Sequence, residues 1–361
     1  MITLDPQVTL ASMLLAPPAK RRRRQRPQPL AIPADEAAAG AGGGGAAAVG
    51  TASGLGATPS AARAPLPSPA ASEINLNEQG MARLSACGPA DVYGAASWRG
   101  TSRRWGSTED TYSALPALSA GGELRVEHEP SFYGVFDGHG GRAAADYCAQ
   151  HLHGSVFGQA CFPASVGDAL RAGFSQTDTA FVKLARQGGA SCGTAAVAAV
   201  LHRGVLTVAH CGDCRAVLAK AGAPGVALTE DHRASRSDER RRIEAQGGSC
   251  ICMGQTWRVD GHLAVSRAIG YEAGGAMKKY VVPDPDTVEH AVGRDDEFVL
   301  LGSDGLWDVI GSGEAVEIAR GQLGAGGTLE QAASALSQRA VERGSRDDVT
   351  VVAFSLTAVD Q

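Results

Sequence analysis

Aromatic side chains and long hydrophobic runs are both scarce in this chain of 361 residues. Only 5% of the residues are Phe, Trp or Tyr, and no apolar run approaches the roughly 18 residues that would indicate a membrane-spanning helix. The short apolar stretch near the N-terminus is followed by the basic run Lys20–Arg26, whereas a secretory signal peptide has its basic residues first. We therefore expect neither a transmembrane segment nor a signal peptide.

A compact set of cysteine and histidine ligands is also missing. The eight cysteines are scattered, which favours reduced thiols over a disulfide framework. Cys211 and Cys214 form a C-x-x-C pair that could hold zinc or act in redox chemistry, but they flank an aspartate at a predicted turn. Cys250 and Cys252 are too close in sequence for a usual zinc knuckle. Thiol titration with and without a chelator would separate a zinc site from free thiols.

Charge is unevenly distributed along the chain. The net charge is −5, yet residues 1–88 carry a net +3, so the remainder carries −8. An acidic body argues against nonspecific nucleic-acid binding by the folded part, and it is compatible with a cleft that holds divalent cations.

The N-terminal quarter differs in composition from the rest. Residues 27–72 are mostly Ala, Gly, Pro and Ser, which cannot bury enough apolar surface to fold. We therefore predict that residues 1–88 are a disordered extension and that residues 89–358 form the folded domain. The basic run at 20–26 is a nuclear-import signal, a patch that binds an acidic partner, or a solvated charge run in a tail. The expected location is therefore the nucleus, the cytoplasm or both.

Short β-rich segments recur in the second part of the chain, with helical patterns between them. The predicted strands are 131–136, 193–201, 204–211, 214–220, 297–303 and 348–356. The predicted helices are 142–157, 237–248 and 328–344, the last of which opens with a Thr328/Gln331 capping box. Short turns within 203–220 predict antiparallel hairpins, and the clustering of strands predicts an α+β fold without regular βαβ alternation.

Acidic residues stand where predicted strands end or begin. They are Asp137, Asp213, Asp304, the pair Asp347–Asp348 and the pair Glu109–Asp110. A single Asp before Gly is usually only a turn residue. Several carboxylates that converge on one rim of a sheet instead indicate a hard cation such as Mg²⁺ or Mn²⁺, because these ions prefer oxygen ligands.

The stretch DGHGGRA, which follows the predicted strand at 131–136, also satisfies the G-x-G-x-x-A pattern of dinucleotide-binding folds. In that interpretation Asp137 would face a pyrophosphate, and no acid follows about 20 residues later to bind a ribose. We therefore favour a metal site.

Nine motifs occur in a fixed order between residues 91 and 356. They are YGVFDGHGG, CGTAAVAAV, AHCGDCRAVL, LTEDHR, RIEAQGG, LAVSRAIG, PDP, VLLGSDGLWDV and GSRDDVTVV. This order resembles that of the metal-dependent protein serine/threonine phosphatases of type 2C, and the low-complexity N-terminus is similar to that of plant members. The resemblance implies a four-layer α-β-β-α sandwich, in which helices flank two central antiparallel sheets on both outer faces.

The resemblance also implies a centre of two Mg²⁺ or Mn²⁺ ions at one end of the sandwich. Asp137 would bridge the two ions, and the Gly138 carbonyl would bind one of them. Asp304 and Asp347 would complete the direct protein ligands.

Four further residues are implied to act around these ligands. Glu109 and Asp110 would act largely through metal-bound water, Asp213 would belong to a third, weaker cation site, and His139 would be the general acid. The implied reaction is hydrolysis of phosphoserine and phosphothreonine by a water that the two cations activate. A serine alkoxide leaves poorly, so an imidazolium acid should help. The implied partners are phosphorylated proteins. We expect no membrane partner, no nucleic acid on the folded domain, and a monomer.

The sequence departs from the family pattern near the predicted phosphate site. The family arginine four residues before Glu109 is Trp105 here, and we expect Arg104 to bind phosphate in its place, since guanidinium pairs bidentately with phosphate. The acid that usually follows Gly270 is Tyr271, which puts a peripheral metal or flap interaction in doubt. The alternative function is therefore a pseudophosphatase that binds phosphoproteins with weak or no turnover, although the complete set of central acids favours catalysis.

Two smaller departures are expected to matter less. The usual Asn after the last metal acid is Asp348. Trp257 does not match the position of the flap tryptophan that docks receptors in plant hormone-regulated members, so we expect it to be an ordinary surface or packing residue.

Overall fold

The computed structural model describes seven segments of the chain. These are residues 75–76, 82–87, 92–101, 108–117, 129–188, 190–271 and 276–356. The basic run at 20–26, the low-complexity segment 27–72, and Arg104 and Trp105 lie outside the described residues.

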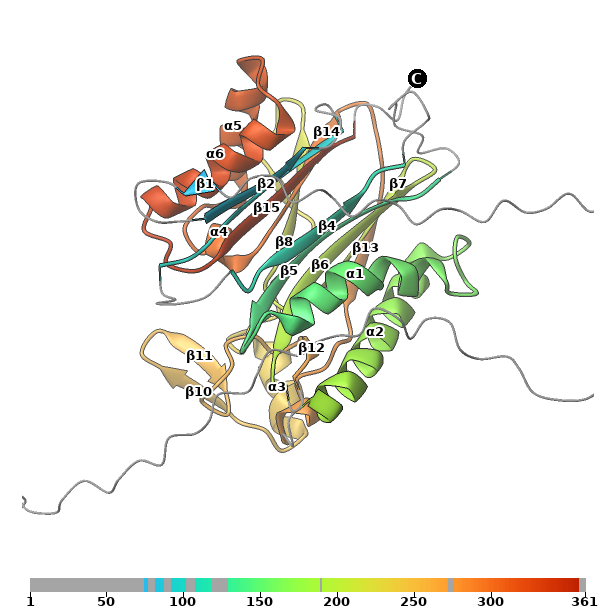
Figure 1. Cartoon of the computed structure of the whole chain (residues 1–361), viewed down its shortest axis with the longest axis vertical. Helices are drawn as coiled ribbons and strands as arrows, with labels where there is room; N and C mark the ends of the chain where they lie inside the picture. Colours follow the sequence, from blue (N-terminus) through green and yellow to red (C-terminus); the bar gives the residue numbers. More distant parts are fainter. Residues whose placement is uncertain are drawn as a thin grey trace, which may run out of the picture.

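Two antiparallel sheets face each other at the centre of the molecule (Figure 1). The first sheet contains, from edge to edge, β1 (Asn75–Leu76), β2 (Ala82–Cys87), β3 (Tyr93–Trp98), β15 (Val349–Ser355), β14 (Asp296–Gly302), β8 (Arg215–Lys220) and β9 (Val226–Ala227). The second contains β13 (Asp286–Ala291), β7 (Val205–Cys211), β6 (Gly193–His202), β5 (Ser131–His139) and β4 (Thr111–Leu115), with β12 (Ile269–Gly270) paired to β6. Because β1 and β2 extend the first sheet beyond β3, this sheet begins upstream of residue 89, the predicted domain boundary.

Helices cover the outer face of each sheet (Figure 1). The helices on the first sheet are α4 (Asp304–Trp307), α5 (Ser312–Gly324) and α6 (Leu329–Glu342), and those on the second are α1 (Ala143–Phe157) and α2 (Val166–Gly188). The predicted four-layer α-β-β-α sandwich is therefore confirmed. No helix in the described segments is long and apolar enough to cross a bilayer.

A smaller group of elements has its own hydrophobic core at one end of the sandwich (Figure 1). Its elements are α3 (Ser237–Ala245), β10 (Cys250–Met253), β11 (Thr256–Val259) and the short 3₁₀ helix η1 (Ala276–Lys279). We call this group the flap region. Trp257 packs at the edge of the flap core, and the Arg240 guanidinium lies 4.7 Å from the centroid of its ring, so Trp257 is a packing residue as expected.

The central strand β6 shows why the sandwich forms. All ten of its residues are buried, because both faces of the strand are covered. Val197 and Leu201 enter the core between the sheets, whereas Ala196 and Val200 face α1 and α2. Successive side chains on a strand point to opposite faces, so a continuous apolar run supplies both interfaces at once.

The prediction of hairpins within 203–220 is correct for one connection and wrong for the other. β6 and β7 form a hairpin through Arg203 and Gly204, whose φ angles of 51° and 70° suit a tight turn between twisted strands. β7 and β8, however, belong to different sheets. Gly212, at φ +105°, lets the chain cross between the sheets and leaves Asp213 at the end of the sandwich.

The predicted capping box of α6 is confirmed. The Gln331 backbone N–H donates to the Thr328 hydroxyl at 3.2 Å, and the Thr328 N–H donates to the Gln331 side-chain oxygen at 2.9 Å. Two backbone donors that the helix itself leaves unpaired are satisfied in this way.

Candidate metal centre

The ends of β4 and β5 bring two acids together. Asp137 lies near the end of β5. The antiparallel register sets Thr111 opposite Phe136, so Asp110, the residue before β4, comes next to Asp137. Burial raises the pKa of Asp137, and the charge of Asp110 raises it further.

Three other connections bring acids to the same end of the sandwich. Asp304 is the first residue of α4, close after β14, and Asp347 stands just before β15. Asp213 lies in the crossing from β7 to β8. Carboxylate oxygens of Asp137, Asp213 and Asp304 lie within 4.8 Å of one another. The predicted convergence of acids is thus observed for these three, whereas Asp347 is outside the 4.8 Å group but near enough to raise the pKa of Asp137 and Asp304.

Burial is the main cause of strongly raised pKa values in this cluster. It raises the pKa of Asp110 to about 8, with a further contribution from Asp348, and that of Asp304 to about 6, with a contribution from Asp347. Burial and neighbouring acids also raise the pKa of Asp137 and Asp213 well above the usual range. Such groups are costly to keep ionised without a counter-charge.

The chemistry of these donors fits a hard divalent cation. Asp304 Oδ1 is buried and has no hydrogen-bond partner within the described part of the chain. The donor set is entirely oxygen, and its carboxylates share one small space with excess negative charge. Mg²⁺ and Mn²⁺ prefer such ligands, and their charge would offset the repulsion among them.

The raised pKa values predict an unusual pH dependence for the metal-free protein. The pKa of an aspartate in the unfolded chain is about 3.9. In the folded protein the pKa of Asp304 is about 6 and that of Asp110 is about 8. Their contribution to stability is therefore complete below about pH 4 and is lost as the pH rises towards 8. Buried histidines such as His232, whose pKa is lowered, oppose this trend only below about pH 6.5. We therefore expect the Tm in EDTA to fall between about pH 6.5 and 8 and saturating Mn²⁺ to remove the fall. A flat or rising Tm in EDTA would contradict the buried cluster.

Asp348 has a structural position that its place in the motif did not reveal. Its carboxylate is buried and accepts the backbone N–H groups of Gly100 and Glu109, both at 2.7 Å. A Cβ on Gly138 would lie 2.4 Å from the Glu109 carbonyl oxygen, so only glycine permits this close approach. Asp348 and Gly138 therefore position the Glu109–Asp110 segment against β5. The Glu109 carboxylate is not part of the 4.8 Å group.

His139 ends β5 beside the cluster and packs against Tyr271. The two ring centroids are 5.3 Å apart, at an interplanar angle of 48°. Tyr271 has a φ of +68°, and its N–H donates to the Cys192 carbonyl at 2.8 Å. A Cβ on Gly193 would lie 2.7 Å from His139 Nε2, so this glycine makes room for the imidazole. At the position where the family has an acid, this chain thus has the aromatic ring of Tyr271, which contacts His139, the predicted general acid.

A second group of possible metal ligands went unnoticed in the sequence. Atoms of His210, His232 and Asp286 lie within 4.8 Å of one another. The two imidazole rings are stacked, 4.3 Å apart and tilted by only 7°, so one ion cannot lie in both ring planes as coordination through ring nitrogens requires. Burial lowers the pKa of His232 to about 4, and its Nε2 lies 3.0 Å from Asp286 Oδ2. We interpret this group as structural.

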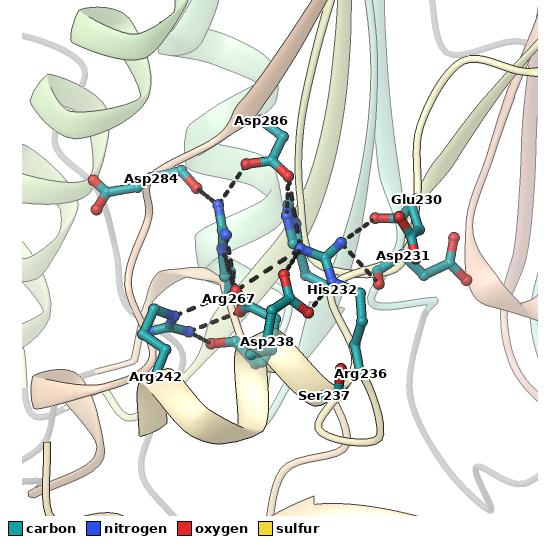
Figure 2. Close-up of polar contacts among 12 residues, drawn as sticks. Glu230, Asp231, His232, Arg236, Ser237, Asp238, Arg242, Arg267, Asp284 and Asp286 are labelled. Atoms are coloured by element: carbon teal, nitrogen blue, oxygen red, sulfur yellow. Dashed lines mark hydrogen bonds and ion pairs between the residues drawn. The ribbon is translucent and has the colours of Figure 1, made fainter. Parts of the chain in front are cut away.

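Ion pairs join the flap region to the second sheet (Figure 2). Glu239 of α3 is buried, and Arg242 and Arg267 both approach its carboxylate to 2.8 Å. Arg267 also pairs with Asp286 of β13 at 2.8 Å. Arg242 and Arg267 belong to motifs that the family resemblance picks out, whereas Glu239 and Asp286 lie just outside them. Spacing alone gave no indication that these residues pair.

The described cysteines are all free thiols, and Cys211 and Cys214 are fully buried. The C-x-x-C pair therefore contributes to packing: Cys211 faces the helices and Cys214 enters the core between the sheets.

Comparison with known proteins agrees with the motif order. The family model described as Protein phosphatase 2C matches residues 99–349. The chain is 43% identical over 266 residues to "Probable protein phosphatase 2C 32" of Oryza sativa subsp. japonica, covering 72% of this chain and 64% of that protein. It is 37% identical over 262 residues to "Probable protein phosphatase 2C 30" of Arabidopsis thaliana, covering 70% and 64%. The chain thus spans slightly less than two thirds of these relatives' length.

Solved structures support the fold. A C. elegans sex determining protein superposes with a TM-score of 0.65 at 25% identity, over 75% of this chain and 66% of that one. A serine-threonine phosphatase 2C from Toxoplasma gondii superposes with a TM-score of 0.63 at 23% identity, over 75% and 96%.

Proposed function

The chain belongs to the protein phosphatase 2C family, and on this basis we propose that it hydrolyses phosphoserine and phosphothreonine in proteins with the help of two Mg²⁺ or Mn²⁺ ions. The observation that carries the proposal is the cluster of buried Asp213 with half-buried Asp137 and Asp304, whose oxygens lie within 4.8 Å of one another. Bound cations would offset the repulsion among these acids, and phosphate-ester hydrolysis is chemistry that paired cations support.

Each residue has a proposed role in this reaction. Asp137, Asp304, Asp347 and the Gly138 carbonyl would hold the two main ions. When bound, these ions would make a water nucleophilic near neutral pH and neutralise charge on the phosphoryl group. Asp348 keeps the neighbouring segment in place through its two backbone hydrogen bonds.

The remaining roles are proposed for residues around these ligands. Glu109 and Asp110 would orient water, and Asp213 would bind a third, weaker cation. Arg104 would contact the substrate phosphate, and the basic run at 20–26 would support nuclear import.

His139 is the proposed general acid, which would protonate the departing alkoxide. His139→Ala should preserve Mn²⁺ affinity and slow hydrolysis of a phosphothreonine peptide by about 10²–10⁴-fold. p-Nitrophenyl phosphate should be affected much less, because nitrophenolate leaves without a proton. Steady-state kinetics with both substrates checks this, with the exposed His151→Ala as a control on α1. If the loss is equal for both substrates, or if Mn²⁺ affinity collapses, His139 is not the acid.

The test of the proposed function is metal-dependent hydrolysis by the purified full chain. We expect turnover of p-nitrophenyl phosphate and of a phosphothreonine peptide with Mn²⁺ or Mg²⁺, and none after chelation. Folded protein that binds Mn²⁺ but shows no turnover would refute the proposal. It would instead support the pseudophosphatase alternative.

A further inference from the structure

Arg233 joins the metal cluster to acids outside it. Its guanidinium lies 3.6 Å from Asp213 Oδ2, 3.4 Å from Asp231 Oδ2 and 2.6 Å from Asp308 Oδ1. Asp213 is at the crossing between the sheets, and Asp308 directly follows α4. One guanidinium therefore pairs with three carboxylates, of which only that of Asp213 belongs to the 4.8 Å group.

The backbone fixes Arg233 beside the crossing. The His232 N–H donates to the Gly212 carbonyl at 2.8 Å, and the Gly212 N–H donates to His232 Nδ1 at 3.3 Å. These bonds tie the residue before Arg233 to the residue before Asp213. The fold thus holds the backbone of Arg233 beside that of Asp213.

The two partners differ sharply in exposure. The Asp213 side chain is 4% exposed, whereas the Arg233 side chain is 33% exposed. Arg233 lines an open cleft of about 380 Å³ together with Arg215, Asp231 and Arg236. None of Asp137, Asp213 and Asp304 lines this cleft, whereas Arg233 both lines it and pairs with Asp213. Arg233 therefore has room to withdraw towards Asp231 and Asp308 while Asp213 stays in place.

We propose that Arg233 is a tethered positive charge that competes with a divalent cation for Asp213 and so weakens the third cation site. This inference rests on the proposed metal centre. A cation that approaches Asp213 meets the like charge of Arg233, 3.6 Å from the same carboxylate, and this repulsion weakens binding unless Arg233 withdraws. The two main ions would be held by Asp137, Asp304 and Asp347 without Asp213 as a ligand, so Arg233 should affect them much less.

The experiment is Mn²⁺ titration of metal-stripped full-length protein, with free Mn²⁺ followed by electron paramagnetic resonance. Arg233→Met should tighten the weakest Mn²⁺ site by about tenfold or more, because a unit charge a few ångströms from a buried ligand is removed. Arg233→Lys keeps the charge and should remain near the unaltered protein. Arg236→Met is the matched control, because Arg236 lines the same cleft but bonds to Asp238 and the Glu230 carbonyl.

A double substitution identifies the ligand through which Arg233 acts. In an Asp213→Asn background, Arg233→Met should leave Mn²⁺ binding unchanged, because the contested ligand is gone. Unaltered or weaker Mn²⁺ affinity in Arg233→Met alone would overturn the inference, as would tightening that persists in the Asp213→Asn background. Phosphatase turnover is measured separately, so a protein that shows the predicted Mn²⁺ shift without hydrolysis refutes the proposed function and leaves this inference standing. If Arg233→Met is unstable, Arg233→Gln gives the same charge removal.

Discussion

Asp137→Asn is expected to abolish metal-dependent hydrolysis and, at the same time, to stabilise the metal-free protein. Asp137 interacts with four other acids of the site. Burial raises its pKa most, and the charges of Asp110, Asp304, Asp213 and Asp347 raise it further. Asparagine keeps the shape but removes the charge that would hold a cation. Since bound metal contributes several kcal/mol of transition-state stabilisation, turnover should fall by about a thousandfold or more.

The gain in stability has the same origin as the loss of activity. Near pH 8 the metal-free cluster must either ionise against its neighbours or take up protons, and both are costly. Removing one of the charges should raise the free energy of unfolding in EDTA by about 1–3 kcal/mol, since each unit of pKa shift is worth about 1.4 kcal/mol. With saturating Mn²⁺ the order should reverse, because only the unaltered protein gains the full binding energy of the ions.

Urea unfolding at pH 8, with EDTA and with Mn²⁺, measures both halves of this prediction alongside peptide hydrolysis. Asp168→Asn is a suitable control, because Asp168 lies on the exposed face of α2, where it pairs with Arg171, and is far from the cluster in the fold. Asp137→Asn protein that is less stable than the unaltered protein in EDTA would show that the cluster is not strained. Retained Mn²⁺-dependent turnover would show that Asp137 is not a ligand.

Helices and strands were predicted correctly where hydrophobic periodicity and local residue preferences indicate the same element. The apolar run of β6 and the capping box at Thr328 both carry their structure within a few residues, and both were predicted correctly. The convergence of Asp137, Asp213 and Asp304 was predictable for a different reason. Acids at strand ends cannot enter a buried sheet, so the end of the sandwich is where they must gather.

Contacts between distant segments were not predictable from one sequence. Nothing local distinguishes the β7–β8 connection, which crosses between sheets, from the β6–β7 hairpin that precedes it. The sequence placed Asp348 among the acids that could bind a cation. In the structure its carboxylate instead accepts hydrogen bonds from backbone amides about 240 residues earlier in the chain. The same holds for Glu239 and Arg267, whose pairing depends on how the flap region folds back onto β13.

Glu239→Ala is expected to be the most destabilising of the substitutions considered, by about 3–5 kcal/mol. It removes the acid that Arg242 and Arg267 share and leaves only Asp286 to pair with Arg267. The Glu239 residue is 1% exposed. Burial alone would raise its pKa, but hydrogen bonds from Arg267 and Arg242 hold the pKa well below the usual range. The stabilisation is thus present above the unfolded pKa of about 4.3 and is lost only at lower pH.

Urea unfolding near pH 7 tests this expectation against an exposed ion pair of the same chemistry. Glu317 of α5 has a side chain that is 66% exposed and pairs with Arg320, so Glu317→Ala should cost less than about 1 kcal/mol. Arg267 also reaches Asp286 of β13, so loss of Glu239 should loosen the flap region first, with faster amide hydrogen exchange in α3 than in β6. A cost for Glu239→Ala no larger than that for Glu317→Ala would mean that water reaches the arginines and that the network does not anchor the flap region.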